Sequence, residues 1–460
     1  MRFLDGPAAA RAVRDVFDDS GYTLGALTER LGPQAFTHLS AGELPPLLRA
    51  TRAADRLDVL ARLFLIGEPV TLRAARSALA PVPVEQWAAG ELISVRDDEV
   101  VGLLVIRPLG EPGHRLVVHD RPDRSGAVRF DHVLGISAST MALAGATIRR
   151  PIEAALDLGT GCGIQGVLAA DHSRRVVVTD VNPRALACAT LTMELNDLAA
   201  VTVRGGDRFD AVVGERFDLI VANPPFVISP SRRYVFRDSG LPLDELCRSI
   251  VRAAPRHLDD GGYCQLLASW AHVRGEDWRD RLAGWFAGSG CDALVLEREA
   301  LDPAAHAASW LCQGPPDQWA EFDEWLDDAE AHDVEAIGFG LITMRRRERG
   351  VPWFRAETAD QDFAMPCGDH LGALFELAAF LERHDDAALL DVTLAAAPDV
   401  VLDEHRRPER GRLDRRRTAS APDGRAAGGG RRRPRHRVPR RRLRRPATPA
   451  SGTGRRRRRP

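Results

Sequence analysis

The sequence predicts an α/β fold: a doubly wound, seven-stranded Rossmann-like sheet, preceded by a mostly helical, winged-helix-like N-terminal domain. Two observations predict the sheet. Short apolar runs alternate with helical patterns from about residue 131 onward. The first of these runs ends in a glycine-rich turn, Asp157–Gly163. Because the strands are apolar and helices separate them, we expect a largely parallel sheet that is covered on both faces.

The length and the charge distribution predict several parts. At 460 residues, 44% of them hydrophobic, the chain is too long for one ordinary domain. The last 56 residues contain 23 Arg and three acidic residues, whereas the preceding residues contain 40 Arg and 62 acidic residues. The body is therefore acidic and the tail basic, and such a tail has little to bury. We predict an N-terminal domain at 1–130, an α/β domain at 131–350, a C-terminal extension at 351–404 and an Arg-rich disordered tail at 405–460.

The extension and the tail differ in character. Apolar patterns predict helices at Leu371–Arg383 and Ala388–Leu402, before the composition changes after Arg406. A basic tail can bind RNA or DNA through its phosphates. An abrupt switch to Arg, Pro, Gly and Ala is also what a shifted reading frame in GC-rich DNA produces, so both interpretations stay open.

The N-terminal domain has a definite predicted order of elements. Val59–Ile66, Thr71–Ala80 and Val84–Ala89 have helical patterns, and Leu92–Arg96 with Val100–Arg107 predicts a β-hairpin. Three helices followed by a hairpin resemble a winged helix. The helices carry no concentrated basic face, so this domain can equally serve only to pack on its neighbour.

Seven strands and three intervening helices follow in the α/β domain. The predicted strands are Ala154–Leu158, Arg175–Asp180, Val201–Arg204, Phe217–Ala222, Tyr263–Ala268, Ala293–Glu297 and Gly338–Met344. The predicted helices are Gly163–Ala170, Pro183–Asn196 and Leu243–His257.

The glycine-rich turn predicts a nucleotide-like ligand. Its glycines let the backbone turn sharply and approach a ligand closely, and the helix that follows presents its N-terminus to an anionic group such as a carboxylate. The turn alone is weak evidence, because nicotinamide enzymes place a similar sequence at the same point.

Acidic residues at three strand ends narrow the choice of ligand. Asp157 precedes the glycines and can meet an ammonium group, while Asp180 ends the second strand and can accept both ribose hydroxyls. Asp207 follows the third strand and can accept a hydrogen bond from an adenine amino group, or simply cap a loop. S-adenosylmethionine (SAM) offers an ammonium, a carboxylate and a ribose. We therefore predict SAM as the cofactor, bound by Asp157, Gly159, Thr160, Gly161, Gly163, Asp180 and Asp207.

A second motif, Asn223-Pro224-Pro225-Phe226, follows the fourth strand. In an open α/β sheet, ligands bind beyond the carboxyl ends of the strands near the topological switch, so this motif and the methyl donor face one crevice. The Asn223 side-chain oxygen and the Pro224 carbonyl can accept hydrogen bonds from both N–H groups of a planar amino group. Phe226 can stack on the same group. We predict methyl transfer to nitrogen, with Asn223, Pro224, Pro225 and Phe226 as the catalytic segment. No cluster of Cys and His has zinc spacing, so we predict no metal site.

Together these motifs resemble the class I SAM-dependent methyltransferases, and among them the N-methyltransferases with an Asn/Asp-Pro-Pro-aromatic signature. The small-domain rRNA guanine-N2 methyltransferases and the HemK-type release-factor glutamine methyltransferases are the most similar groups. The resemblance covers about residues 131–345. It implies SAM binding at the glycine-rich turn and the three acids, a target nitrogen at Asn223–Phe226, and a lead-in helix beside the cofactor within Asp131–Ala144. The N-terminal part does not resemble the helical bundle of the glutamine enzymes.

Three functions remain open. Methylation of an exocyclic base amine in RNA, or less favourably DNA, is the preferred prediction, supported by the winged-helix-like segment and by Arg232, Arg233 and Arg237 in the loop Ser229–Gly240. Methylation of a protein glutamine amide is the second, because an acidic body repels polyanions. The third is a non-catalytic protein that binds SAM and nucleic acid, against which the intact Asn-Pro-Pro-Phe motif argues.

The cysteine pattern and the apolar runs predict the compartment. The seven Cys are scattered and form no Cys-x-x-Cys pair, which is typical of a reducing cytosol. No signal-peptide pattern and no apolar run of about 20 residues is present. We expect a cytoplasmic protein without a membrane partner, and no pattern specifies its oligomeric state.

Overall fold

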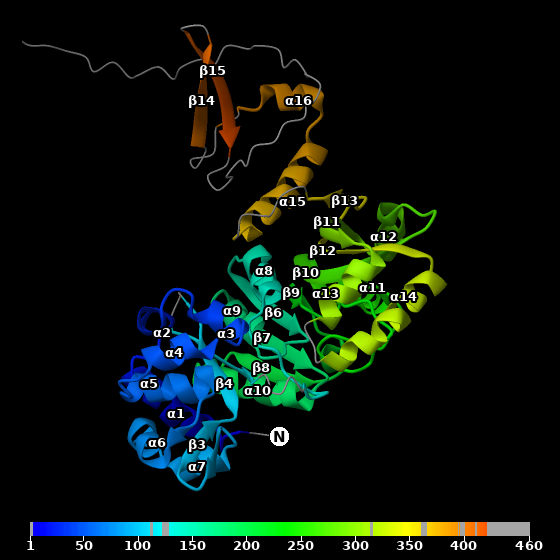
Figure 1. The fold of residues 1–460 in the computed structure, drawn as a ribbon. Coiled ribbons are helices and arrows are strands. Elements are labelled where there is room, and N and C mark those ends of the chain that lie inside the picture. The colour runs from blue at the N-terminus through cyan, green and yellow to red at the C-terminus, as the bar shows by residue number, and fades with distance from the viewer. Residues whose placement is uncertain are drawn as a thin grey trace, which may run out of the picture. The chain divides into compact units, whose positions relative to one another are not determined.

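The chain divides into two compact units, Met1–Val392 and Thr393–Pro460. Figure 1 shows its fold in the computed structural model. The structure describes residues 3–110, 114–121, 128–312, 316–359, 366–393, 395, 401–409 and 412–420.

An eight-stranded sheet forms the centre of the first unit, with the strand order β13-β11-β12-β10-β9-β6-β7-β8. All pairs from β10 to β8 are parallel, whereas β12 runs antiparallel to both of its neighbours. The strands are β6 (Ile152–Leu158), β7 (Ser173–Asp180), β8 (Val201–Gly205), β9 (Phe217–Ala222), β10 (Leu258–Val273), β11 (Cys291–Leu301), β12 (Val334–Arg346) and β13 (Phe354–Thr358). The seven predicted strands are therefore present, and the predicted fold class is confirmed.

The eighth strand, β13, was not predicted. It comes from the segment after residue 350 and pairs in parallel with β11, with Ala293 opposite Phe354 and Glu297 opposite Thr358. The Phe354 ring packs against Phe286 of the neighbouring helix, with 5.3 Å between the ring centroids. Because β13 pairs with the outer edge of β11, the backbone groups of β11 between Ala293 and Glu297 are not left unpaired at the edge of the sheet.

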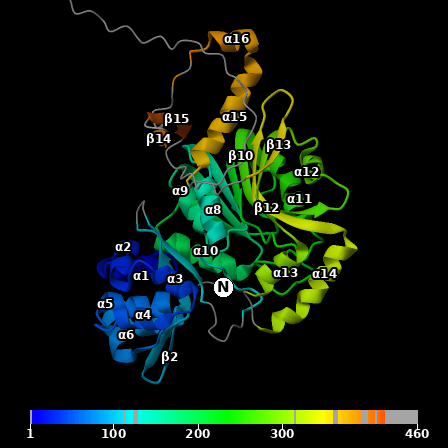
Figure 2. The same ribbon diagram turned by 45° about the horizontal axis from the view of Figure 1, so that its top comes forward.

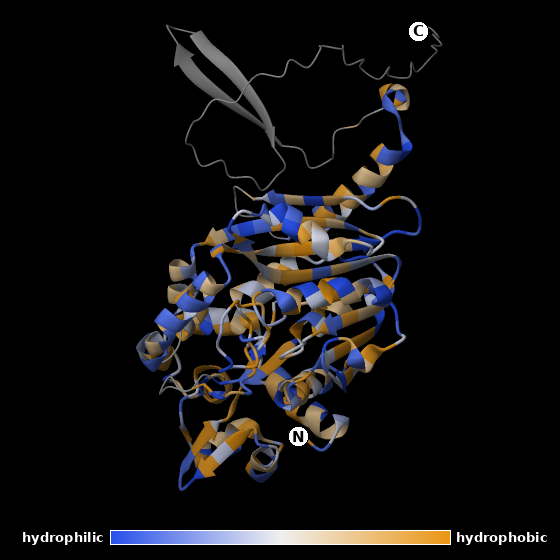
Figure 3. Cartoon of the chain, turned by 90° about the vertical axis from the view of Figure 1, so that its right-hand side faces the viewer, coloured by the Kyte–Doolittle hydropathy of each residue, from blue (hydrophilic) through white to orange (hydrophobic). Residues whose placement is uncertain are grey.

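Helices cover both faces of the sheet, as Figure 2 shows. Side chains of α8, α9, α10 and α15 pack with Ala155, Val176 and Leu219 on one face. Side chains of α11 and α12 pack with Leu156 and Val177 on the other, so neighbouring residues of one strand face opposite layers. These helices are α8 (Ala138–Ala146), α9 (Ile164–Ala170), α10 (Pro183–Leu195), α11 (Glu245–Ala253), α12 (Trp278–Phe286) and α15 (Gly368–Arg383). In Figure 3, hydrophobic segments run along the strands between these layers.

The N-terminal region keeps the predicted order of three helices and a hairpin, with one correction. A short strand, β1 (Val70–Thr71), joins β2 (Ile93–Arg96) and β3 (Glu99–Gly102) in a sheet of order β1-β3-β2. The predicted single strand Val100–Arg107 is wrong, because β3 ends at Gly102 and β4 (Leu104–Pro108) pairs instead with β5 (Leu116–Asp120). An added Cβ at Gly102 would lie 2.0 Å from the Leu63 carbonyl oxygen, so this glycine allows the close approach at which the strand divides.

The other elements of this region are helical. They are α1 (Pro7–Asp19), α2 (Leu24–Leu31), α3 (Ala35–Ser40), α4 (Leu44–Ala50), α5 (Arg56–Ala61) with a following π-helical turn (Arg62–Ile66), α6 (Leu72–Leu79) and α7 (Val84–Ala89). Within the described ranges, no helix is both long and apolar enough to cross a membrane.

The C-terminal predictions need correction. The predicted helix Ala388–Leu402 overlaps α16, which covers Asp386–Asp391, but it is wrong at residues 392–393 and at 401–402, which lie in a strand. Residues 394 and 396–400 of the predicted helix lie outside the described residues. The second unit contains an antiparallel hairpin, β14 (Val401–Glu409) and β15 (Arg412–Ser420), where disorder was predicted from residue 405. The rest of the predicted tail lies outside the described residues.

One buried side chain, Gln265 on β10, holds the start of the α/β domain. It accepts a hydrogen bond from the Ile148 backbone N–H at 2.7 Å and donates to the Ala146 carbonyl at 2.8 Å. Gln265 is fully buried. It therefore connects β10 to the end of α8 and to the segment that leads into β6.

We predict that Gln265→Leu lowers the free energy of unfolding by about 2 to 4 kcal/mol, because it leaves two buried backbone groups unpaired at about 1–3 kcal/mol each. Urea unfolding followed by circular dichroism measures the change. Gln86→Leu on the exposed face of α7 is the matched control and should change the free energy by less than about 0.5 kcal/mol. Equal stability of the two variants would contradict this role for Gln265.

Candidate functional site

A cavity of about 470 Å³ opens at the carboxyl ends of β6, β7 and β9. From β6 the chain proceeds outward to β7 and β8, then returns across the sheet to β9 on the opposite side of β6. This reversal leaves a crevice between the connections that follow β6 and β9. No group of three or more His, Cys, Asp or Glu side chains within the described part of the chain is arranged to hold a metal ion.

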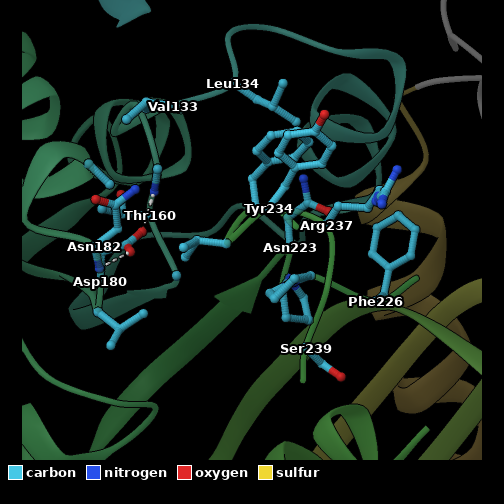
Figure 4. Close-up of a pocket in the computed structure, with 18 of the residues that line it drawn as sticks. Val133, Leu134, Thr160, Asp180, Asn182, Asn223, Phe226, Tyr234, Arg237 and Ser239 are labelled. Carbon is cyan, nitrogen blue, oxygen red and sulfur yellow. Dashed lines mark hydrogen bonds between the residues drawn. The ribbon is translucent and has the colours of Figure 1, made fainter. Parts of the chain in front are cut away.

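The cavity brings together ten of the eleven residues that the sequence predicted for the site. Those lining it are Asp157, Gly159, Thr160, Gly161, Asp180, Asp207, Asn223, Pro224, Pro225 and Phe226. Gly163 is the exception: it is the N-cap of α9, and an added Cβ there would lie 2.8 Å from the Met193 methyl group. Figure 4 shows Asp180 beside Thr160 and Asn182, and Asn223 near Phe226 and Tyr234.

Asp157 is 1% exposed and anchors the glycine-rich turn. Its Oδ2 accepts hydrogen bonds from the Thr160 hydroxyl at 2.5 Å and from the Gly166 backbone N–H at 3.0 Å. Burial raises the pKa of Asp157 to about 7, although these two hydrogen bonds act in the opposite direction. A cation bound beside this carboxyl group would favour its ionised form.

Asp180 fixes the other side of the turn. Its Oδ2 accepts a hydrogen bond from the Gly161 N–H at 2.9 Å, and its Oδ1 accepts one from the Asn182 N–H at 2.8 Å. Burial raises the pKa of Asp180 above its usual range. Asp207 is exposed and forms an ion pair with Arg208 at 2.9 Å, so it is much less constrained than the two other acids.

The Asn-Pro-Pro-Phe motif contains an unusual polar atom. The Asn223 Oδ1 is buried and finds no hydrogen-bond partner among the described residues. A buried acceptor without a partner costs about 1–3 kcal/mol, so this oxygen is suited to accept a hydrogen bond from a ligand in the cavity. Nearby, the Phe226 ring packs against Phe339 at 5.0 Å and against Trp310 at 6.4 Å between centroids.

Sequence reasoning missed an aromatic pair in the loop after this motif. The Tyr234 and Phe236 rings stack at 5.3 Å with an interplanar angle of 16°, and His132 meets Phe236 edge-on at 5.9 Å. All three residues line the cavity. Two aromatic residues separated by one position were the available signal, but the loop was interpreted through its arginines.

Two of the three arginines in this loop form ion pairs with carboxylates of the protein. Arg237 is buried and pairs with Asp238 at 2.7 Å, and Arg233 pairs with Glu321 at 3.1 Å. Arg232 is exposed and lines the cavity. Two of the three side chains expected to meet phosphates are therefore already engaged by carboxylates, which reduces the support for a nucleic-acid partner.

The predicted lead-in segment forms a wall of the cavity. Val133, Leu134 and Gly135 line it, followed by the first residues of α8. The helix begins at Ala138, where the Ser137 hydroxyl accepts a hydrogen bond from the Thr140 N–H at 3.2 Å. Its position beside the glycine-rich turn agrees with the expected lead-in helix.

Comparison with protein families identifies the central part of the chain. Residues 138–274 match the family of the methyltransferase small domain. This segment is therefore similar to the methyltransferase small domain. Residues 19–103, before it, match a domain of unknown function (DUF7059). The predicted resemblance to class I SAM-dependent methyltransferases is thereby confirmed.

Curated relatives of the methyltransferase small domain differ in their targets. The release factor glutamine methyltransferase of Xylella fastidiosa (strain Temecula1) is 35% identical over 129 residues, which cover 25% of this chain and 46% of that protein. The ribosomal RNA small subunit methyltransferase C of Klebsiella pneumoniae is 34% identical over 117 residues, which cover 25% of this chain and 30% of that protein. The chain thus spans less than half the length of either relative.

Solved structures resemble the chain over a larger share of its length. A methyltransferase from Pyrococcus furiosus has 17% sequence identity and a TM-score of 0.29, with 45% of this chain and 82% of that chain covered.

We predict that SAM binding weakens in acid. If Asp157 meets the SAM ammonium, it must be ionised, and its pKa is about 7 in the free protein. The dissociation constant should then rise about tenfold for each pH unit below that pKa and level off above it. Calorimetric titrations of SAM between about pH 5 and 7.5 measure this, below the range in which an α-amino group loses its proton.

Asp157→Asn is the matched control, because it keeps the shape of the side chain and removes the titrating group. This variant should bind SAM weakly and should lose the part of the pH dependence that comes from Asp157. Wild-type affinity that does not change over the same pH range would remove Asp157 from the ammonium site.

Proposed function

We propose that this protein is a SAM-dependent N-methyltransferase that acts on a planar amino or amide nitrogen. The observation that carries the proposal is the buried, unpartnered Oδ1 of Asn223, which shares one cavity with the glycine-rich turn. The chain matches its relatives over only part of their length, so the support for the whole activity comes from this geometry together with the methyltransferase small domain.

The residues around the turn fit SAM. Gly159 and Gly161 have φ values of 73° and 55°, and an added Cβ on either would meet no atom within 4 Å. The space beside the turn is therefore open for a ligand that approaches the backbone closely. In this proposal Asp157 holds the ammonium group, Asp180 the ribose hydroxyls and Asp207 the adenine amino group, with Thr160 supporting Asp157.

The catalytic segment acts by orientation. When bound, SAM supplies an electrophilic methyl group on its sulfonium. A planar amino or amide nitrogen is a poor nucleophile because its lone pair is delocalised into the neighbouring π system. The Asn223 Oδ1 and the Pro224 carbonyl accept hydrogen bonds from the N–H groups of the target nitrogen. These bonds direct the nitrogen at the methyl group and stabilise the positive charge that develops on it. As the N–C bond forms and the S–C bond breaks, one N–H proton leaves to solvent.

Aromatic residues select a flat group. Phe226 offers a ring beside Asn223, and the stacked Tyr234 and Phe236 line the same cavity. A planar base or carboxamide can lie against such faces, whereas a tetrahedral alkyl amine gains less from them.

Two targets fit this site. An exocyclic base amine of RNA, or of DNA, is the target favoured by the sequence. One relative is named ribosomal RNA small subunit methyltransferase C, which is consistent with an RNA target. The amide of a protein glutamine is the second candidate. The engagement of Arg233 and Arg237 by carboxylates specifically favours this second target, because few cations remain at the cavity for phosphates.

We predict that Asn223→Ala lowers kcat by about 10²–10³-fold, because it removes one preorganised hydrogen-bond acceptor at the reacting nitrogen. SAM affinity should stay close to wild type, since Asn223 contacts the target in this proposal. Single-turnover methyl transfer and calorimetric SAM titration measure the two quantities separately.

Asp180→Ala serves as the opposite control. It should weaken SAM binding by about tenfold or more, as expected when hydrogen bonds to a charged group are lost. Near-normal turnover in Asn223→Ala would exclude Asn223 from the chemistry, and wild-type SAM affinity in Asp180→Ala would exclude Asp180 from the cofactor site.

The target is tested with methyl-labelled SAM, whole-cell extract and the full-length protein, followed by digestion of the labelled material. Release of label by ribonuclease identifies RNA, and release only by protease identifies a protein. The Asn223→Ala variant is the blank. Label transfer that is equal in this variant and in the wild type, or absent from both while SAM binds, would contradict the proposed enzyme.

A further inference from the structure

The N-terminal domain is joined to the cofactor side of the sheet through its last strand, β5. One edge of β5 pairs with β4, and the other lies against α10. Asn196, just after α10, accepts a hydrogen bond from the Leu116 N–H at 2.9 Å and donates to the Leu116 carbonyl at 2.7 Å. The Thr192 hydroxyl accepts one from the Val118 N–H at 3.0 Å. Side chains of α10 therefore take the place of a further strand along β5.

The end of β5 contacts both domains at once. The Arg121 guanidinium donates to the backbone carbonyls of Leu63 at 2.7 Å and Leu104 at 3.0 Å, both in the N-terminal domain. Its neighbour Asp120 accepts hydrogen bonds from Arg184 of α10 at 2.7 and 2.8 Å. The last residue of β5, Asp120, thus contacts α10, while Arg121 directly after it contacts the N-terminal domain.

Asp120 also holds the wall of the cavity. Its Oδ2 accepts a hydrogen bond from the Val133 N–H at 3.0 Å, and its own N–H donates to the Val133 carbonyl at 3.2 Å. Asp120 is only 3% exposed, so these partners take the place of water around its carboxylate. Val133 and Leu134 line the cavity and lie along its upper part in Figure 4.

The same wall is connected to the proposed ribose site. The Asn182 side-chain amide donates to the Asp131 carbonyl at 2.9 Å, while the Asn182 backbone N–H donates to Asp180 at 2.8 Å. A displacement of the wall would thus shift Asn182 and, through it, Asp180. Asp120 itself is not among the described residues that line the cavity, so it acts through its neighbours.

We propose that Asp120 is a positioning residue through which the N-terminal domain holds the wall Asp131–Gly135 against the cofactor and so sets the affinity for SAM. This assigns a role to the strand that follows the domain of unknown function. It rests on the proposed function in one respect only, namely that the cavity binds SAM.

The test compares SAM binding to full-length Asp120→Asn and wild type by calorimetry. Asn keeps the size of the side chain but removes the charge that binds Arg184. The dissociation constant for SAM should rise about tenfold, the scale of one lost charge-assisted hydrogen bond. Hydrogen exchange at the Val133 amide should also become faster in the variant, because its acceptor is weakened.

Arg11→Ala is the matched control. Arg11 on α1 pairs with Asp197 at 3.1 Å, which also connects the N-terminal domain to the end of α10, but both side chains are largely exposed. This variant should leave SAM affinity and Val133 exchange unchanged. If Asp120 had a purely structural role, its substitution would lower the melting temperature without changing the SAM affinity of the folded protein. SAM affinity and Val133 exchange are therefore measured well below the melting temperature.

The outcomes separate the two proposals. Wild-type protein that fails to bind SAM overturns the proposed function. SAM binding by wild type with equal affinity in Asp120→Asn overturns the positioning role alone. If Asp120→Asn does not fold, Arg184→Lys gives the same test, because it keeps the positive charge and loses the two-point contact. Affinity equal to wild type in that variant, with unchanged Val133 exchange, also overturns the role.

Discussion

The parallel pairing of β6 with strands on both sides is the constraint on which the site depends. Asp157 pairs with Val178 of β7 and with Val221 of β9 at the same level of the sheet. The carboxyl ends of three strands are therefore aligned, and the connections that follow them meet in one crevice. Residues that are far apart in the sequence thereby become the walls of a single cavity.

Much of this could be predicted from the sequence, because it depends on local patterns. Apolar strand runs, the glycine-rich turn and the Asn-Pro-Pro-Phe motif each occupy a few consecutive residues. Their meeting point follows from the topology of an open sheet, which placed ten predicted residues in one cavity. Asn223 could be named for its chemistry, but the missing hydrogen-bond partner of its Oδ1 is visible only in the folded chain.

The features that escaped prediction depend on contacts between distant segments. Arg233 pairs with Glu321, which lies far along the chain, so nothing near Arg233 in the sequence signalled this contact. Arg237 pairs with its neighbour Asp238, but its burial and its contact with Gln318 depend on the fold. Likewise, β13 exists because β11 offers it an open edge. The division of the hairpin at Gly102 required knowledge of how close the Leu63 carbonyl lies.

The contact between β5 and α10 has a consequence for how the protein would select a large substrate by its dimensions. Since the strand and the helix share several buried hydrogen bonds, the N-terminal domain behaves as a fixed arm rather than as a tethered module. A macromolecule that touches this arm while its reactive nitrogen enters the cavity must span one set separation. Selectivity would then depend on the distance in the partner between the surface that touches the N-terminal domain and the nitrogen that enters the cavity. It would depend on the chemistry of the modified group as well.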